Sequence, residues 1–213
     1  MDESFPIDQR NRLRRRSQRG RYDHATVNAI FDEARICHVA FQVDGQPIAL
    51  PTIHARIGSR LYMHGSMANR MLGALVSGGP VSATATLVDG LVLARSAFHH
   101  SMNYRSAVAF GRARNVDDPA EKLLAFEALV ERLMPGRWND SRPPNVEEIA
   151  TTRVVCMPID QASAKVRTGD PVDDASDHTL DHWAGVVPLT TVPGSPVPAE
   201  DLRPGIVPPP YLP

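Results

Sequence analysis

The sequence predicts a mainly β protein with flanking helices, in which six or seven antiparallel strands form a barrel or a sandwich. Two observations support this class. Short strand-like runs recur along residues 22–168, and turn dipeptides such as Asp-Gly and Gly-Ser separate several of them. The chain is also 42% hydrophobic and 22% charged, a composition that supports a packed core and argues against general disorder.

Turn dipeptides place the individual strands. Strands at residues 36–43 and 47–55 flank Asp44-Gly45, which strongly indicates a tight hairpin. A turn at Gly58-Ser59 leads into a short strand at residues 60–64. Further strands are expected at residues 80–88, 91–96, 106–113 and 153–159, with a second Asp-Gly turn at positions 89 and 90 between the first two of them.

Three helices are expected to flank these strands. The first two lie at about residues 24–34, after a capping Asp23, and at about residues 67–76. The third begins at Asp118, where Pro119 takes the first helical position and the Glu three residues past the cap completes a variant of the capping box. Its apolar residues share one face, so we expect this helix to be scaffold.

The chain divides into a core and two arms. Residues 1–21 carry seven arginines against three acids and are expected to form a solvated, partly helical arm, or alternatively an arm that binds an anion. Residues 22–168 form the core domain. Residues 169–213 form an extension in which nine of the 19 prolines lie between 188 and 213, so it is expected to run extended over the surface.

Overall charge and composition exclude several classes of protein. The net charge of −1 disfavours a polyelectrolyte binder, and we do not expect a nucleic-acid partner. No apolar run approaches the roughly 20 residues that span a bilayer, and no signal-peptide core follows Met1, so a cytoplasmic protein without a membrane segment is expected. Cys37 and Cys156 lie on apolar segments and are expected to be reduced and buried.

The segment LYMHGSMANRML, residues 61–72, is the best candidate for an anion site. A strand ends at His64, Gly65 permits a sharp turn, and Ser66 is a plausible cap for the next helix. The free N–H groups of residues 67–69 would then point at one spot, and Arg70 lies in a first turn that contains no acid. A phosphate would suit this site, but an ordinary serine-capped helix with a solvent-facing arginine fits these residues equally well.

Other chemistry-bearing residues are less specific. Adjacent histidines at 99 and 100 would point to opposite faces of a strand, and His178 and His182 lack the glutamate of a zinc-protease pattern, so no metal site is expected. The sequence has no G-x-S-x-G nucleophile-elbow motif, which disfavours a hydrolase. Donor-rich Tyr104, Arg105 and Ser106 open a strand, and Lys165 and Arg167 share a strand face, either as an anion site or as a solvated edge.

Four segments together resemble the pyridoxamine 5′-phosphate oxidase-like, FMN-binding split-barrel proteins, in the branch with flavin-nucleotide-binding and nitroimidazole-resistance proteins. The segments, in chain order, are HVAFQVDGQPIALPTIHAR, LYMHGSMANRML, TLVDGLVLARSAFHHSMNYRSAVAFGRA and ASAKVR, and the resemblance covers about residues 20–190. It implies a six- to seven-stranded antiparallel split β-barrel. It also implies a homodimer that holds the flavin across the barrel mouth at the subunit interface.

The resemblance also implies which residues hold the flavin. The strand-to-helix turn would bind the phosphate, and one strand edge would face the isoalloxazine ring. A further strand, from the same chain or from the partner chain, would add donors. The candidate cofactor-binding residues are Pro51, Thr52, Ile53, His54, His64, Gly65, Ser66, Asn69, Arg70, Tyr104, Arg105, Ser106 and Lys165. The arginine- and histidine-bearing C-terminal signature of pyridoxamine phosphate oxidases is absent, so oxidation of that substrate is not expected.

The function expected on this basis is that of an FMN-dependent oxidoreductase. It would pass reducing equivalents to a small nitroaromatic- or quinone-like acceptor, with His54 or His100 as a candidate proton donor. Related barrels bind FAD, a deazaflavin or haem, and these stay alternatives to FMN. The alternative functions are a flavin or haem carrier or sensor without turnover and, in a different class, a metal hydrolase.

Overall fold

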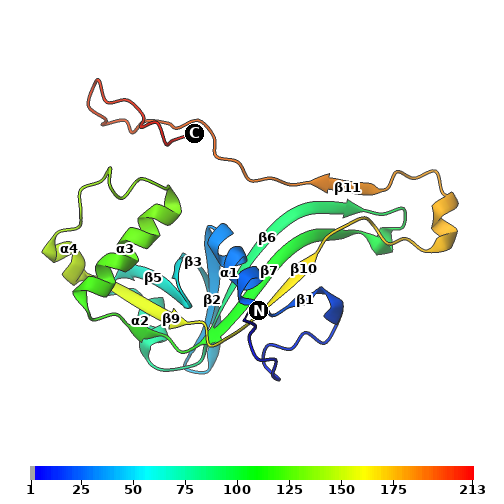
Figure 1. The fold of residues 1–213 in the computed structure, drawn as a ribbon, viewed down its shortest axis with the longest axis horizontal. Helices are drawn as coiled ribbons and strands as arrows, with labels where there is room; N and C mark the ends of the chain where they lie inside the picture. The colour runs from blue at the N-terminus through cyan, green and yellow to red at the C-terminus, as the bar shows by residue number, and fades with distance from the viewer. Residues whose placement is uncertain (1–2) are drawn as a thin grey trace.

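The computed structural model describes residues 3–213 and confirms the mainly β class (Figure 1). Two antiparallel sheets form the framework. The larger has the order β1-β10-β7-β6-β2-β3, with β11 paired to β6, and the smaller has the order β4-β5-β9-β8. The strands are β1 Gly20–Arg21, β2 Ile36–Val43, β3 Gln46–Ile53, β4 Ala55–Ile57, β5 Arg60–Ser66, β6 Val81–Leu93, β7 Ser101–Gly111, β8 Arg114–Asn115, β9 Thr152–Pro158, β10 Gln161–Arg167 and β11 Gly185–Pro188.

The two predicted turns nearest the amino end of the barrel are confirmed. Asp44 and Gly45 have φ values of 52° and 77°, which is the left-handed conformation that a two-residue type I′ hairpin requires. The turn joins β2 to β3 with Val43 opposite Gln46. Gly58, with φ of 58°, makes the turn between β4 and β5.

The predicted turn at Asp89 and Gly90 is wrong, because β6 continues through both residues to Leu93. The register of β6 against β7 shifts between Val88 and Gly90, so the dipeptide forms a bulge. A Cβ atom on Gly90 would lie 3.0 Å from Val186 of β11. Glycine is therefore needed here for the close approach of a third strand and not for a reversal of the chain.

The expected strand at 47–55 is interrupted at His54. β3 ends at Ile53 in the larger sheet, and β4 begins at Ala55 in the smaller one. His54 is the residue at which the chain passes between the sheets, and its side chain is fully buried.

The main core contains side chains of both sheets together with those of α1 and α2. The helices are α1 His24–Glu33, α2 Arg70–Val76, α3 Pro119–Leu133 and α4 Val146–Thr151, with short 3-10 turns η1 Ser17–Arg19, η2 Ala97–His99 and η3 Ala175–Thr179. Val27, Ile30 and Phe31 of α1 pack with buried alanines of β6, β7 and β10. Alanines on the sheet leave room for the larger side chains of the helix.

The third helix covers the smaller sheet, as the sequence predicts for a scaffold element. Asp118 caps it by accepting hydrogen bonds from the N–H groups of Ala120 and Glu121, at 3.2 and 3.3 Å. The Glu121 side chain does not accept a hydrogen bond from the backbone N–H of Asp118, as a complete capping box would require. It accepts a 2.7 Å hydrogen bond from the Tyr62 hydroxyl and so ties α3 to β5.

The amino-terminal arm is attached to the barrel more firmly than expected. Phe5 is buried in the main core, and the buried Asn11 donates a 3.1 Å hydrogen bond to the carbonyl of Ala162 in β10. Most of its arginines remain exposed, as predicted, although η1 is a single 3-10 turn. Residues 1 and 2 of the predicted arm lie outside the described part of the chain.

The carboxy-terminal extension runs along the surface as predicted. After β11 pairs with β6, residues 189–208 are exposed, and the chain returns to the body at Tyr211, whose hydroxyl donates to Asp140 at 2.7 Å. Figure 1 shows the far end of β6 and β7, together with β11 and η3, reaching away from the part that carries α2, α3 and α4. None of the helices within residues 3–213 has the length and apolar character needed to cross a membrane.

Both cysteines should be inert in the folded protein. Cys37 and Cys156 are fully buried, and burial raises the pKa of Cys37 to about 12 and raises that of Cys156 as well. Because the thiolate is the reactive species, we expect no labelling by a thiol reagent at pH 8 over the time in which both thiols react in guanidinium chloride. Rapid labelling of either cysteine in the native protein would contradict this burial.

Candidate functional site

The helix start beyond β5 is built differently from the sequence-based expectation. Asn69 and not Ser66 caps α2, because the Asn69 Oδ1 accepts a 3.0 Å hydrogen bond from the N–H of Leu72. Ser66 is the last residue of β5, and its hydroxyl accepts only a 3.2 Å bond from the N–H of Ala68. The helix therefore begins at Arg70, three residues later than predicted.

The N–H groups expected to be free at this turn are occupied. Met67 donates to the carbonyl of Thr151 at 3.1 Å, and Asn69 donates to the carbonyl of Ser66 at 2.9 Å. The cradle of residues 67–69 predicted for an anion is therefore absent. Any anion at this turn would have to be held mainly by side chains.

Two arginine side chains supply positive charge at the turn. Arg70 opens α2, and Arg153 of β9 lies opposite Gly65 of β5. A Cβ atom on Gly73 would lie 3.1 Å from the Arg153 Nη1, so this guanidinium lies against α2, one turn beyond Arg70. Within residues 3–213 neither arginine has a carboxylate within 4.0 Å.

Arg153 is a candidate that sequence reasoning missed. It lies 83 positions beyond Arg70 and belongs to no recognisable motif. The one signal that could reveal it is the register of β9 on β5, which long-range pairing sets. Two uncompensated cations beside one helix start, whose first turn contains no acid, favour an anionic ligand.

The edge of β3 offers main-chain donors at defined positions. β3 is the last strand of the larger sheet, so one side of its backbone is unpaired. The type I′ turn makes Val43 and Gln46 a hydrogen-bonded pair, and the alternation of an antiparallel ladder then directs residues 47, 49, 51 and 53 away from β2. Because 47 and 51 are prolines, the outward N–H groups are those of Ala49 and Ile53.

A cavity joins this edge to the start of α2. It has a volume of about 180 Å³ and is largely apolar, with a single charged residue at its margin. The lining residues are Phe41, Ile48, Leu50, Arg70 and Met71. The structure therefore brings together two segments that the resemblance assigns to one flavin site, the strand at Leu50 and the turn at Arg70.

A larger cavity of about 340 Å³ lies at the other end of α2, beside the Asp44–Gly45 turn. Asp44 is the one charged residue among the described residues that line it. This cavity offers no cation for an anionic group, so the smaller cavity is the better candidate.

The predicted donors on β7 and β10 lie apart from this cavity. Ser106 and Lys165 are cross-strand partners near the middle of the larger sheet, and Tyr104 lies on the same face as Ser106. β7 is three strand positions from β3, which corresponds to about 14 Å at the usual strand spacing. Within one chain, therefore, these side chains do not complete the site at β3.

The Arg105 guanidinium forms ion pairs with two carboxylates of the fold. Its Nη2 lies 2.7 Å from Glu33 of α1 and 2.7 Å from Asp89 in the bulge of β6. Hydrogen bonds to these two carboxylates raise the pKa of Arg105. The guanidinium ties α1 to the sheet and is not a free donor for a ligand.

The candidate histidines occupy very different environments. His54 is fully buried and donates a 2.9 Å hydrogen bond from Nε2 to the carbonyl of Phe31, and burial lowers its pKa. That position does not fit the expected role of a proton donor to a surface ligand. His64 lies on the exposed end of β5, with its ring edge-on to Phe126, and His100 is exposed beside the β6–β7 connection.

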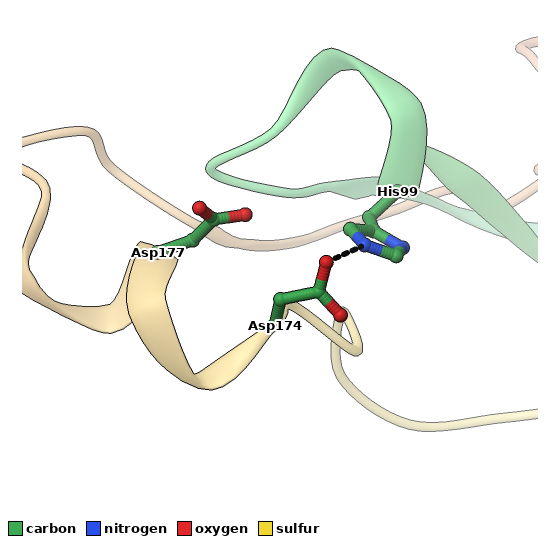
Figure 2. Close-up of side chains that lie close together, drawn as sticks. All are labelled: His99, Asp174 and Asp177. Carbon is green, nitrogen blue, oxygen red and sulfur yellow. Dashed lines mark ion pairs between the residues drawn. The ribbon is translucent and has the colours of Figure 1, made fainter.

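A histidine and two aspartates that the sequence analysis did not connect meet near η3. His99, Asp174 and Asp177 each place one potential ligand atom within 4.8 Å of the others (Figure 2). His99 Nε2 already lies 3.3 Å from the Asp174 carboxylate, which is largely exposed. We interpret the group as a contact that fastens η3 to the end of the β6–β7 hairpin.

Comparison with known proteins gives the class of this protein. The family model described as pyridoxamine 5′-phosphate oxidase matches residues 23–166, and the chain therefore belongs to that family. A search of the curated proteins found no match.

Solved structures include two relatives that align with nearly the whole chain. The flavocytochrome Anf3 from Azotobacter vinelandii is 38% identical with a TM-score of 0.89, and the alignment covers 96% of this chain and 95% of that one. The FAD and heme binding protein from Mycobacterium smegmatis is 35% identical with a TM-score of 0.86, over 91% and 95% of the two chains. A putative 5-nitroimidazole antibiotic resistance protein from Bacteroides thetaiotaomicron, 22% identical with a TM-score of 0.59 over 69% and 86%, shares the fold.

His54 should make stability depend on pH. Burial lowers the pKa of His54 from its ordinary value of 6.5, so the unfolded chain gains a proton there that the folded chain does not. The free energy of unfolding should therefore be highest above pH 6.5 and should decrease as the pH falls toward 5. Replacing His54 with Gln should flatten this part of the profile, measured by thermal melts, whereas His182→Gln, an exposed control, should not.

Proposed function

We propose that this chain binds FAD at the edge of β3 and the start of α2, and that it is an electron-transfer protein that also binds haem. The observation that carries the proposal is the similarity to two proteins whose names specify a flavocytochrome and FAD with haem, at 38% and 35% identity over more than nine-tenths of this chain. FAD replaces FMN as the preferred flavin for this reason. The fold by itself does not indicate whether a member of this family binds FAD or FMN.

The residues at the cavity fit a flavin. Ile48 and Leu50 offer an apolar wall for a planar ring, and the outward N–H groups of Ala49 and Ile53 could donate to its polar edge. Arg70 and Arg153 would hold the phosphates, since guanidinium groups suit phosphate oxygens. A bound flavin would supply the redox chemistry, and the protein would supply position and charge.

A homodimer would explain why the site is incomplete in one chain. The cavity of about 180 Å³ is smaller than the roughly 300 to 1,000 Å³ of typical ligand pockets. Tyr104 and Lys165 lie on a different part of the sheet, where a second copy could present them to the first. We therefore propose that two chains complete two flavin sites between them.

We propose that the electrons pass to a small nitroaromatic- or quinone-like acceptor. The second candidate function is a carrier or sensor without turnover, and one observation favours it. Arg70 is the one titratable residue that lines the cavity among the residues described, and His54 is buried away from solvent. Within residues 3–213, therefore, no proton donor lines the cavity.

The visible spectrum and the mass of the purified protein test the main proposal. Supplied with FAD and haem, the protein should retain about one of each per chain and elute at twice the chain mass. Rapid reoxidation of the reduced holoprotein by a quinone or a nitroaromatic compound would indicate an enzyme, and inertness would indicate a carrier. A monomer that retains no flavin would contradict the proposal.

The two arginines should bind the phosphate end of the flavin. Loss of a charge-assisted hydrogen bond is worth about 1.5–3 kcal/mol, so Arg70→Ala and Arg153→Ala should each weaken FAD binding by roughly 10- to 100-fold. Riboflavin, which has no phosphate, should bind the variants and the unaltered protein alike. Arg15→Ala removes an equal charge from the exposed arm and serves as the control, with fluorescence titration as the measurement.

A further inference from the structure

We propose that the cavity of about 340 Å³ at the carboxy-terminal end of α2 binds a small organic cation, an amine whose ammonium group lies at the Asp44 carboxylate and whose apolar part lies toward Phe41. The cavity proposed for the flavin lies at the other end of the same helix, beside Arg70. The inference goes beyond the proposed function, because it requires neither a flavin nor haem.

The cavity has the size of a pocket for a small molecule. Its volume lies within the roughly 300 to 1,000 Å³ that ligand pockets usually have. A water molecule takes about 30 Å³ in the liquid, so a ligand of on the order of ten non-hydrogen atoms would fill the cavity. This size suits an amine with a short chain and one ring.

The cavity has an apolar interior and a polar rim. Phe41 and Val81, which line it, are 6% and 4% exposed and belong to the main core. The polar side chains that line it are those of Gln42, Asp44 and Ser77, and all three residues are exposed. A ligand would therefore place its apolar part on the two core residues and its polar group at the rim.

The rim carries a negative charge that the fold does not neutralise. Within residues 3–213 no Lys, Arg or His nitrogen lies within 4.0 Å of the Asp44 carboxylate. The backbone of Asp44 is fixed, because it occupies the first central position of the type I′ turn with φ of 52°. A carboxylate held beside an apolar cavity favours a cation there.

The end of α2 adds to this negative potential. Its last turn contains no basic residue. The carbonyl of Ala74 accepts hydrogen bonds from the N–H and the hydroxyl of Ser77, at 3.3 and 2.7 Å, whereas the carbonyls of Leu75 and Val76 accept none from the part of the chain described. A cation near the carboxy-terminal end of a helix is stabilised by such carbonyl groups.

A neighbouring arginine does not occupy the site. Arg112 follows β7 and donates a hydrogen bond from Nη1 to the carbonyl of Gly78, just beyond α2. Among the described residues that line the cavity there is no Lys, Arg or His. The Asp44 carboxylate is therefore available to a ligand.

Other classes of ligand fit the cavity less well. An anion would meet the Asp44 carboxylate without a compensating cation, and a neutral molecule would gain nothing from its charge. Calcium takes about six to eight oxygen ligands and magnesium about six, but Asp44 supplies the one carboxylate among the described lining residues. An organic amine requires only this one charge and the apolar interior.

A matched set of three small molecules tests the preference for a cation. Phenethylamine, 2-phenylethanol and phenylacetate share a benzene ring and at pH 7 carry a positive charge, no charge and a negative charge. Calorimetric titration of the full-length protein should show phenethylamine binding about three- to tenfold more tightly than the alcohol, and the acid binding more weakly than either. Added salt should reduce the difference, because it screens an exposed carboxylate.

Asp44→Asn removes the charge and keeps the turn. Asn-Gly is a favoured type I′ dipeptide, so the hairpin and FAD binding should be retained. In this variant phenethylamine should bind no more tightly than 2-phenylethanol. Asp181→Asn is the matched control, because it removes an equal charge from an exposed residue that does not line the cavity and should leave all three affinities unchanged.

Ala74→Leu tests whether the ligand lies in the cavity. Ala74 lines the cavity from α2, so a larger side chain would fill part of the space, and leucine is a good helix former. This variant should bind phenethylamine and 2-phenylethanol at least threefold more weakly. Its melting temperature and its affinity for FAD report that α2 is folded.

Several outcomes would overturn the inference. Equal affinities of the unaltered protein for the three probes, or no binding at millimolar concentration, would show that the cavity does not select amines. An Asp44→Asn variant that still prefers phenethylamine, or an Ala74→Leu variant with unaltered affinities, would place the ligand elsewhere. Displacement of phenethylamine by FAD would assign the cavity to the flavin, since Phe41 lines both cavities. Selective binding of phenethylamine by a protein that retains no FAD would support this inference while the proposed function fails.

Discussion

The register of the β2–β3 hairpin is the constraint on which the candidate site depends. The left-handed conformations of Asp44 and Gly45 fix Val43 opposite Gln46, and this pairing decides which backbone groups of the edge strand face outward. A slip of one residue would turn the prolines at 47 and 51 toward β2, where each would cost a ladder hydrogen bond. Turn chemistry and proline placement therefore specify the same register.

Charge compensation separates scaffold arginines from candidate ligand-binding arginines. Arg105 holds two carboxylates and joins α1 to the sheet. Arg70 and Arg153 have no such partner within the described residues, although they lie beside the same helix. Counting arginines in the sequence cannot distinguish these roles, because the difference lies in which acids the fold brings near each guanidinium.

Much of the local structure could be predicted, because it depends on neighbours in the sequence. The hairpin at Asp44-Gly45, the caps at Asp23 and Asp118 and the burial of Cys37 follow from turn propensity, capping and apolar pattern. The same rules failed at Asp89-Gly90. There β11, from almost 100 residues away, pairs with β6 and draws the dipeptide into a continuous strand.

The sequence by itself determined the fold class, the family and the two segments, around Leu50 and Arg70, that line the candidate cavity. Tertiary structure alone decided that Arg153 joins Arg70, that Asn69 replaces Ser66 as the cap and that His54 is buried. The physical reason is the sequence separation over which each interaction acts. Turns and caps are set by residues a few positions apart, whereas burial and the neutralisation of charge depend on which distant strands pair, and pairing is a property of the whole chain.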